Sequence, residues 1–228
     1  MLQLGRKKTV VVSIHGFGSR LSSEMNPLSK FLKKKHYDFR KFDIFDLKNP
    51  EDADPKQWIS RCEEQVKKAL DKSDHVVLLG FSMGGVIASY LASIYPVEQL
   101  ILVAPAFRYL DLTLLKTAAT NKIKEVAQNL EKDKKLKPSS QQVKCFVSIV
   151  DTYRSSIAQV DCPILIIHGT NDEVIDFESS REAYKKISHN KKRLIFLEGA
   201  HHRLLYDGMM EETAFAIIEQ MLKKNLIK

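Results

Sequence analysis

The sequence predicts an α/β fold in which a mostly parallel central sheet is flanked by helices. Short apolar runs rich in β-branched residues alternate with longer stretches that have helical spacing, which is the pattern of repeated β-α-β units. Several of the short runs are continuously apolar, as is typical of strands buried on both faces of a parallel sheet. The chain has 228 residues, 44% of them hydrophobic, enough for one sizeable core. We therefore interpret residues 1–228 as one domain.

The strands are predicted from apolar runs bounded by turn residues. Residues 9–14 form the first continuous run, whereas residues 39–47 alternate between polar and apolar side chains. The predicted strands are, in order, residues 9–14, 39–47, 75–81, 100–104, 163–168 and 193–197.

The helices are predicted from apolar side chains that recur every three or four residues. Residues 55–70 show this spacing most clearly, and Pro55 suits the first turn of a helix. Residues 84–95 are small and apolar and stop before Pro96. The predicted helices are residues 28–35, 55–70, 84–95, 179–187 and 211–226.

One long stretch between Ala104 and Asp161 contains helical patterns but no convincing strand. A structureless loop of this length is improbable inside a domain. We therefore expect a small helical insertion, with residues 111–130 and 142–157 as its two helices.

Ser82 lies in the run Gly80-Phe81-Ser82-Met83-Gly84, between a predicted strand and a predicted helix. A serine in a G-x-S-x-G turn of this kind is exposed above the sheet edge as a nucleophile. The alternative interpretation is a glycine-rich turn in which the serine only caps the helix. The sequence context favours the nucleophile.

Two late segments contain the partners that a serine nucleophile requires, a carboxylate and then a histidine. Asp172 follows the strand predicted at residues 163–168, with Asp176 as the alternative carboxylate and helix cap. His201 and His202 follow the last predicted strand. Because the carboxyl ends of parallel strands share one edge of a sheet, these residues are expected near Ser82. The residues alone leave open which histidine is the base.

Backbone N–H groups that stabilise a developing oxyanion are expected from two places. One is the N–H of Met83, directly after the nucleophile. The other is the N–H of Phe17, in the run His15-Gly16-Phe17-Gly18 that follows the first predicted strand.

Taken together, these segments resemble the α/β-hydrolase superfamily, in particular its compact branch of esterases, monoacylglycerol lipases and "serine aminopeptidase S33-like" proteins. The similar stretches are residues 14–18, 80–85, 168–175 and 199–202. In the family pattern Gly-x-x-His the base corresponds to His202 and the acid to Asp172, and residues 108–159 are similar to the helical cap over the acyl or alcohol pocket.

The resemblance implies a serine hydrolase that cleaves carboxylic esters of small or medium acyl groups through an acyl-enzyme, with no cofactor and no metal. A thioesterase or amidase with the same triad is one alternative, because one triad serves several leaving groups. A non-catalytic ligand-binding homologue is the other. The family's usual opening β-hairpin is expected to be missing or reduced here, since fewer than ten residues precede Thr9.

Composition and charge give no support for nucleic-acid binding, secretion or membrane insertion. The net charge of +8 comes mostly from lysines in separate clusters, which is typical of solvated helix faces. No nucleic-acid-binding motif, signal peptide or integral membrane segment is predicted. Three scattered cysteines without a C-x-x-C motif favour a reduced cytoplasmic setting. A small-molecule ester is the expected partner.

Overall fold

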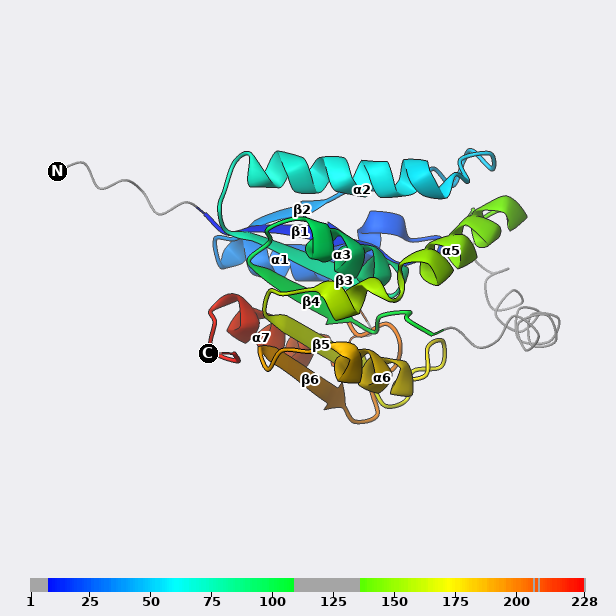
Figure 1. Ribbon diagram of the computed structural model, residues 1–228. Coiled ribbons are helices and arrows are strands. Elements are labelled where there is room, and N and C mark those ends of the chain that lie inside the picture. Colours follow the sequence, from blue (N-terminus) through cyan, green and yellow to red (C-terminus); the bar gives the residue numbers. More distant parts are fainter. Residues whose placement is uncertain (1–7, 109–135, 207, 209, 228) are drawn as a thin grey trace.

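A six-stranded sheet with helices on both faces forms the centre of the protein (Figure 1), which is described here from a computed structural model covering residues 8–108, 136–206, 208 and 210–227. Its strands are β1 (Val10–Ile14), β2 (Asp38–Lys41), β3 (Val76–Phe81), β4 (Gln99–Val103), β5 (Ile164–Gly169) and β6 (Lys192–Leu197). They lie in the order β2-β1-β3-β4-β5-β6, and every pair of neighbours is parallel. The predicted fold class is confirmed.

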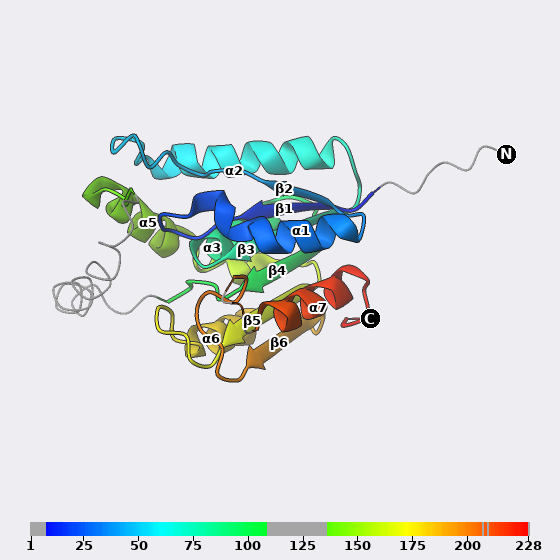
Figure 2. The same cartoon turned by 180° about the vertical axis from the view of Figure 1, so that it is seen from behind.

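The helices cover the sheet in two layers. They are α1 (Asn26–Lys34), α2 (Pro55–Leu70), α3 (Met83–Ile94), α5 (Ser140–Tyr153), α6 (Glu178–Lys186) and α7 (Glu211–Leu222). Two 3-10 helices, Leu21–Met25 and Ser156–Gln159, complete the described elements. α1 and α7 cover one face (Figure 2), whereas α2, α3, α5 and α6 pack over the other.

Successive residues of the central strands are buried in different layers. Along β3, Val76 and Leu78 belong to the core under α2 and α3, whereas Val77 and Leu79 belong to the core under α1 and α7. Side chains of a strand alternate between the faces of a sheet, so a strand covered on both sides must be apolar throughout. This requirement explains the continuous apolar runs of the sequence.

The second strand is shorter than predicted. β2 ends at Lys41 rather than at residue 47. Beyond it the Ile44 N–H donates to Nε2 of His15 (2.9 Å), and the Asp46 N–H donates to the Asp52 carboxylate (2.7 Å). These side-chain acceptors replace the strand ladder, so residues 44–47 form a loop in which Ile44 and Phe45 are buried. α7 also ends early, at Leu222, where Lys224 turns into the left-handed region with φ 62°.

The inserted segment is described only in its second half. α5 and the 3-10 helix Ser156–Gln159 match the helix predicted at residues 142–157. A capping box starts α5, because the Ser139 hydroxyl accepts the Gln142 N–H and the Gln142 side chain accepts the Ser139 N–H. The helix predicted at residues 111–130 lies outside the described residues.

The order of the strands reverses between β1 and β3. The chain passes from β1 to β2 on one side and then returns to form β3 on the other. Loops that follow two such strands diverge, which opens a crevice at the carboxyl edge of the sheet. Gly16 and Ser82 follow these two strands, whose last residues pair through Ile14 and Gly80.

Candidate active site

Ser82 occupies a sharp turn between β3 and α3. Its φ of 52° and ψ of −119° are unusual for a residue with a side chain and cost roughly 1–3 kcal/mol. The Ser82 N–H donates to the Val103 carbonyl (3.0 Å), and its own carbonyl accepts the N–H groups of Gly85 and Ala106 (2.9 and 3.1 Å). The neighbouring strand and helix thus hold the strained turn in place.

Two glycines allow this turn to pack closely. A β-carbon on Gly80 would collide with the Gly84 carbonyl oxygen, and one on Gly84 would collide with the carbonyl oxygen of Ile14. The first turn of α3 therefore lies directly on β1 and β3. The glycines of the predicted motif are required by this backbone contact.

Asp172 and His202 are in contact, although thirty residues separate them in the chain. Oδ2 of Asp172 lies 2.7 Å from Nδ1 of His202, and the two side chains are 0% and 9% exposed. The other carboxylate oxygen accepts the N–H groups of Val174 and Ile175, both at 2.8 Å. Since a carboxylate faces Nδ1, this nitrogen carries the proton and Nε2 keeps its lone pair.

A second histidine binds the same carboxylate. Nε2 of the fully buried His168 lies 2.9 Å from Oδ2 of Asp172 and 3.1 Å from the Ile175 carbonyl, so it must donate. Its Nδ1 then accepts from the Ser180 hydroxyl at 2.6 Å. Burial by itself would raise the pKa of Asp172, but the hydrogen bonds from His168 and His202 outweigh it and lower the pKa below its ordinary value. Asp172 is therefore an anion.

The two alternatives from the sequence lie elsewhere. His201 is exposed, and its Nδ1 lies 3.2 Å from a carboxylate oxygen of Glu173. Asp176 accepts the Glu178 N–H at 2.9 Å, at the first turn of α6. The structure places His202, rather than His201, against Asp172.

The loop after β1 lies beside Ser82. A β-carbon on Gly16 would come within 3.1 Å of the Ser82 β-carbon. Phe17 follows, and its ring stacks on Phe146 of α5 with centroids 5.0 Å apart. Met83 is the first residue of α3, where an N–H has no acceptor within the helix. Both predicted oxyanion donors are thus on backbone that adjoins Ser82.

A cavity of about 410 Å³ connects these groups. Ser82 and His202 both line it but do not form a hydrogen bond with each other in this structure. Its walls are formed by Gly16, Phe17, Gly18, Ser19, Arg20, Glu24, Phe81, Ser82, Phe146, Val174, Ile175, His202, Arg203 and Tyr206.

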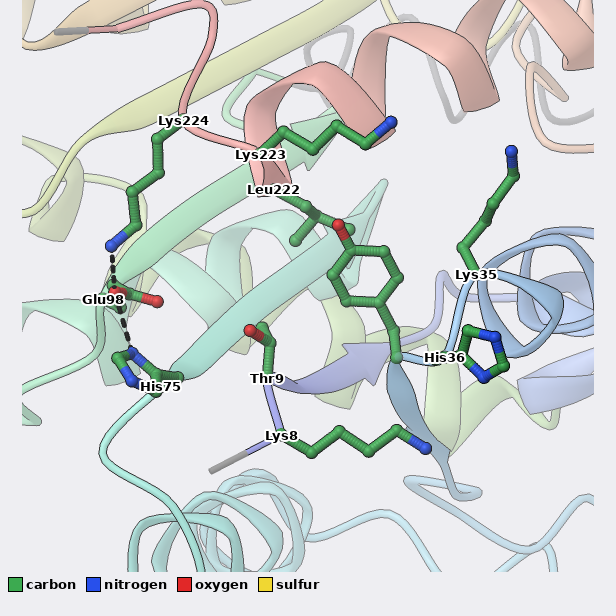
Figure 3. A pocket seen from close by; sticks show the side chains of 10 residues that line it. Lys8, Thr9, Lys35, His36, His75, Glu98, Leu222, Lys223 and Lys224 are labelled. Carbon is green, nitrogen blue, oxygen red and sulfur yellow. Dashed lines mark hydrogen bonds and ion pairs between the residues drawn. The ribbon is translucent and has the colours of Figure 1, made fainter. Parts of the chain in front are cut away.

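A larger cavity of about 630 Å³ lies at the opposite edge of the sheet (Figure 3). Its walls come from the residues just before β1, β2, β3 and β4 and from the end of α7. There Glu98 is bound by His75 (3.1 Å) and Lys224 (2.6 Å). Lysines at helix ends are favoured by the helix dipole, and no serine or cysteine lines this cavity. We therefore place the candidate site at the cavity that contains Ser82.

Neither a metal-binding cluster nor a membrane-spanning helix is present among the described residues. They contain no group of three or more His, Cys, Asp or Glu side chains that could hold a metal ion. None of their helices combines the length and apolar character needed to cross a membrane.

Sequence reasoning missed three groups around the site. His168 ends a strand, and nothing in its local pattern indicates a bond to Asp172 four residues later. Glu24 belongs to a 3-10 helix in a stretch without a clear periodicity. Phe146 belongs to a predicted helix, but its position against Phe17 depends on how α5 docks.

Solved structures that share this fold include proteins named as lipases and esterases. A soluble variant of monoglyceride lipase from Saccharomyces cerevisiae superposes with a TM-score of 0.77 and 19% identity, covering 100% of this chain and 90% of that one. A monoacylglycerol lipase from Paleococcus ferrophilus gives 0.74 and 15%, covering 96% of each chain. At these identities the likeness shows the fold, which is that of the α/β-hydrolases.

The family follows from the sequence match. The model of the family described as "Serine aminopeptidase, S33" matches residues 53–208, and the chain belongs to this family. This match and the fold confirm the predicted resemblance to the α/β-hydrolase superfamily and its branch of esterases, lipases and S33-like proteins.

Curated relatives match over part of their length. A Mycoplasma genitalium protein named as an esterase/lipase is 34% identical over 108 residues, 44% of this chain and 39% of that protein. Human alpha/beta hydrolase domain-containing protein 17C is 29% identical over 131 residues, 57% of this chain and 31% of that protein. The chain thus spans less than half the length of these relatives.

Proposed function

We propose that the chain hydrolyses carboxylic esters of small or medium acyl groups through an acyl-enzyme, with Ser82, His202 and Asp172 as its catalytic triad. The observation that carries this proposal is the buried Asp172–His202 pair, whose imidazole lines the same cavity as a serine in a strained turn. The names of the yeast lipase and the Mycoplasma relative agree with this reaction.

In the first half of the reaction, the Ser82 hydroxyl attacks the ester carbonyl and passes its proton to Nε2 of His202. Asp172 holds the imidazole by Nδ1 (2.7 Å) and stabilises the imidazolium that forms. The carbonyl oxygen becomes an oxyanion, and the N–H groups of Phe17 and Met83 bind it. One such donor contributes roughly 2.7–4 kcal/mol to the transition state.

The tetrahedral intermediate then collapses. The imidazolium gives its proton to the alkoxide leaving group, and the acyl group stays on Ser82. Water repeats the sequence with His202 as base, which releases the carboxylic acid and restores the hydroxyl. No cofactor or metal enters this proposal.

The acyl group would lie against apolar side chains. Phe17, Phe146, Val174 and Ile175 line the cavity that contains Ser82. Since Phe146 belongs to α5, we also propose that residues 108–159 form a cap on a single domain. Thioesters and amides with the same acyl group are the alternative substrates, because one triad serves several leaving groups.

Ser82→Ala tests the nucleophile. We expect the wild type to hydrolyse p-nitrophenyl butyrate and to be labelled by a fluorophosphonate, and the variant to lose both. Ser93→Ala is the matched control, because Ser93 lies on the same helix and donates to the Tyr90 carbonyl. Full activity in Ser82→Ala would contradict the proposal. Tight ligand binding without turnover of any ester or thioester would favour a non-catalytic binding protein.

His202→Ala and His201→Ala separate the two histidines. We expect the first to reduce kcat by a factor of about 10³ or more, and the second to leave kcat within a few fold. The reverse result would assign the base to His201. Both variants should be compared with the wild type at the same pH.

The cytoplasmic setting is also a proposal. It rests on the three cysteines, all of them free thiols in the structure, as is usual in a reducing compartment. Fractionation of the source cells with an antibody to this chain would test it.

A further inference from the structure

Glu24 is a buried carboxyl group that the proposed reaction does not use. It lies on the 3-10 helix Leu21–Met25, is 6% exposed, and lines the cavity that contains Ser82 and His202. Its Oε1 accepts the Gly16 N–H at 2.5 Å. This bond reaches the loop that provides Phe17, the proposed oxyanion donor.

The peptide group between Gly16 and Phe17 is also held by a hydrogen bond. Nδ1 of His15 lies 2.7 Å from the Gly16 carbonyl oxygen, and Nε2 accepts the Ile44 N–H at 2.9 Å. The proton therefore resides on Nδ1, which donates to Gly16. Burial lowers the pKa of His15 to about 4, so the ring is neutral near pH 7. Because the peptide is trans, the Phe17 N–H points away from the held carbonyl.

We infer that Glu24 is a positioning residue for the oxyanion hole: by accepting the Gly16 N–H, it fixes the loop so that the Phe17 N–H faces the substrate carbonyl oxygen. His15 and Glu24 then hold the two peptide groups on either side of the Gly16 α-carbon. The inference rests on the proposed function.

Burying a carboxyl group at this position has an energetic cost. Burial raises the pKa of Glu24 to about 7, while the Gly16 N–H and the charges of Arg20 and Arg203 act to lower it. A neutral amide of equal length would accept the same bond without burying an ionisable group. Perturbed carboxyl groups of this kind cluster at functional sites.

Three substitutions of Glu24 separate the length of its side chain, its carboxyl group and the presence of a hydrogen-bond acceptor. Glu24→Gln keeps an oxygen acceptor at the same distance from the backbone, Glu24→Asp keeps the carboxyl group on a shorter side chain, and Glu24→Ala removes the acceptor. For each, kcat and KM would be measured with p-nitrophenyl butyrate, together with the inhibition constant of a trifluoromethyl ketone and the melting temperature. Glu64→Asp and Glu64→Ala on the exposed face of α2 are the controls.

We expect Glu24→Gln to retain kcat within about threefold. Glu24→Asp and Glu24→Ala should lower kcat by about 10- to 100-fold, less than the loss of a whole oxyanion donor, with KM changed less than twofold. The ketone forms a tetrahedral adduct with the same oxyanion, so its inhibition constant should rise in parallel. The controls should match the wild type.

Wild-type kcat and ketone affinity in Glu24→Asp would overturn the inference, as would equal losses in the Gln and Asp variants. If Glu24→Ala does not fold, the Gln and Asp variants still decide the question. An active Glu24→Asp beside an inactive Ser82→Ala would reject only the inference. Ester hydrolysis that survives in Ser82→Ala would reject the proposed function, and the inference with it.

Discussion

At the scale of single residues, the cavity shows how hydrogen bonds set the charge of a buried group. Asp172 and Glu24 are both buried carboxyls, yet their pKa values move in opposite directions. Asp172 receives bonds from two imidazoles and two backbone N–H groups, which stabilise its anion. Glu24 has one bond, from Gly16, and burial dominates. The number of donors decides which carboxyl stays charged.

His168→Ala is expected to weaken both folding and activity. It removes a donor from the buried Asp172 anion and an acceptor from Ser180, which should lower the free energy of unfolding by roughly 1–3 kcal/mol. Urea unfolding and kcat would be measured together. His168→Gln, whose amide can still donate, should recover part of both losses. If His168→Ala matches His189→Ala, a histidine that contacts the Val160 carbonyl instead, the bond to Asp172 has no such role.

Glu24 should make stability depend on pH. Its pKa is raised from 4.5 to about 7 in the folded state, so the folded chain holds this proton more tightly than the unfolded chain. The resulting stabilisation is complete below pH 4.5 and is lost as pH rises through 7. Relative to Glu24→Gln, the wild type should lose roughly 3 kcal/mol between pH 4 and 8. Unfolding in urea at several pH values checks this, and parallel curves would contradict it.

At the scale of elements, the docking of α3 positions the candidate site. Gly84 contacts the carbonyl end of β1, and Gly85 lies against Pro105 after β4. The Ser82 N–H donates to the Val103 carbonyl and the Ala106 N–H donates to the Ser82 carbonyl, which connects the same turn to β4 and to the loop after it. The serine therefore depends on three strands, and a shift of α3 would move it.

Gly84→Ala tests this contact. The added methyl group would meet the backbone oxygens of Ile14 and His15, which cannot move aside as a flexible side chain could. We expect the free energy of unfolding to fall by roughly 1–3 kcal/mol or more. Gly18→Ala is the matched control, since its β-carbon would meet nothing within 4 Å. Equal stability of the two variants in urea would show that the turn can relax.

α5 contributes Phe146 to the cavity and stacks it on Phe17. Phe146→Ala should therefore enlarge the cavity beside Ser82. The preferred acyl chain of p-nitrophenyl esters should then become longer. The measurement is kcat/KM over a series from acetate to decanoate. Val143→Ala, an exposed position on the same helix, should leave the profile unchanged. A profile that is identical in both variants would place the acyl group elsewhere.

At the scale of the whole molecule, the core layer between the sheet and α2, α3, α5 and α6 encloses the cysteines. Cys62 and Cys145 are buried, and Cys162 is partly buried. Burial raises the pKa of all three thiols, to about 12 for Cys145 and Cys162. Since the thiolate is the reactive species, the native protein should be inert to alkylation.

Iodoacetamide at pH 8 should therefore label almost no cysteine in the folded protein and all three in urea. Intact mass measured over time gives the number of adducts. Activity should persist throughout the native reaction. Rapid labelling of one cysteine, with the fold retained, would show that its surroundings open more readily than the structure indicates.

Much of the architecture was predictable because it depends on local chemistry. Strands covered on both faces must be apolar throughout, and helices must carry an apolar stripe, so both leave periodic patterns. The candidates Ser82, Asp172 and His202 could be named because each follows a predicted strand in a known order. The predicted length of β2 was wrong because the Ile44 N–H bonds to His15 and the Asp46 N–H bonds to Asp52. No local pattern in the sequence encodes these contacts.

Local patterns in the amino-acid sequence predict the fold class, the order of the elements and the short list of candidate residues. Tertiary packing is what brings His202, and not the adjacent His201, against Asp172, and what brings His168 and Glu24 to the same site. The reason is physical. Propensity and periodicity act over a few residues, whereas hydrogen bonds between distant loops depend on how the sheet and its helices pack.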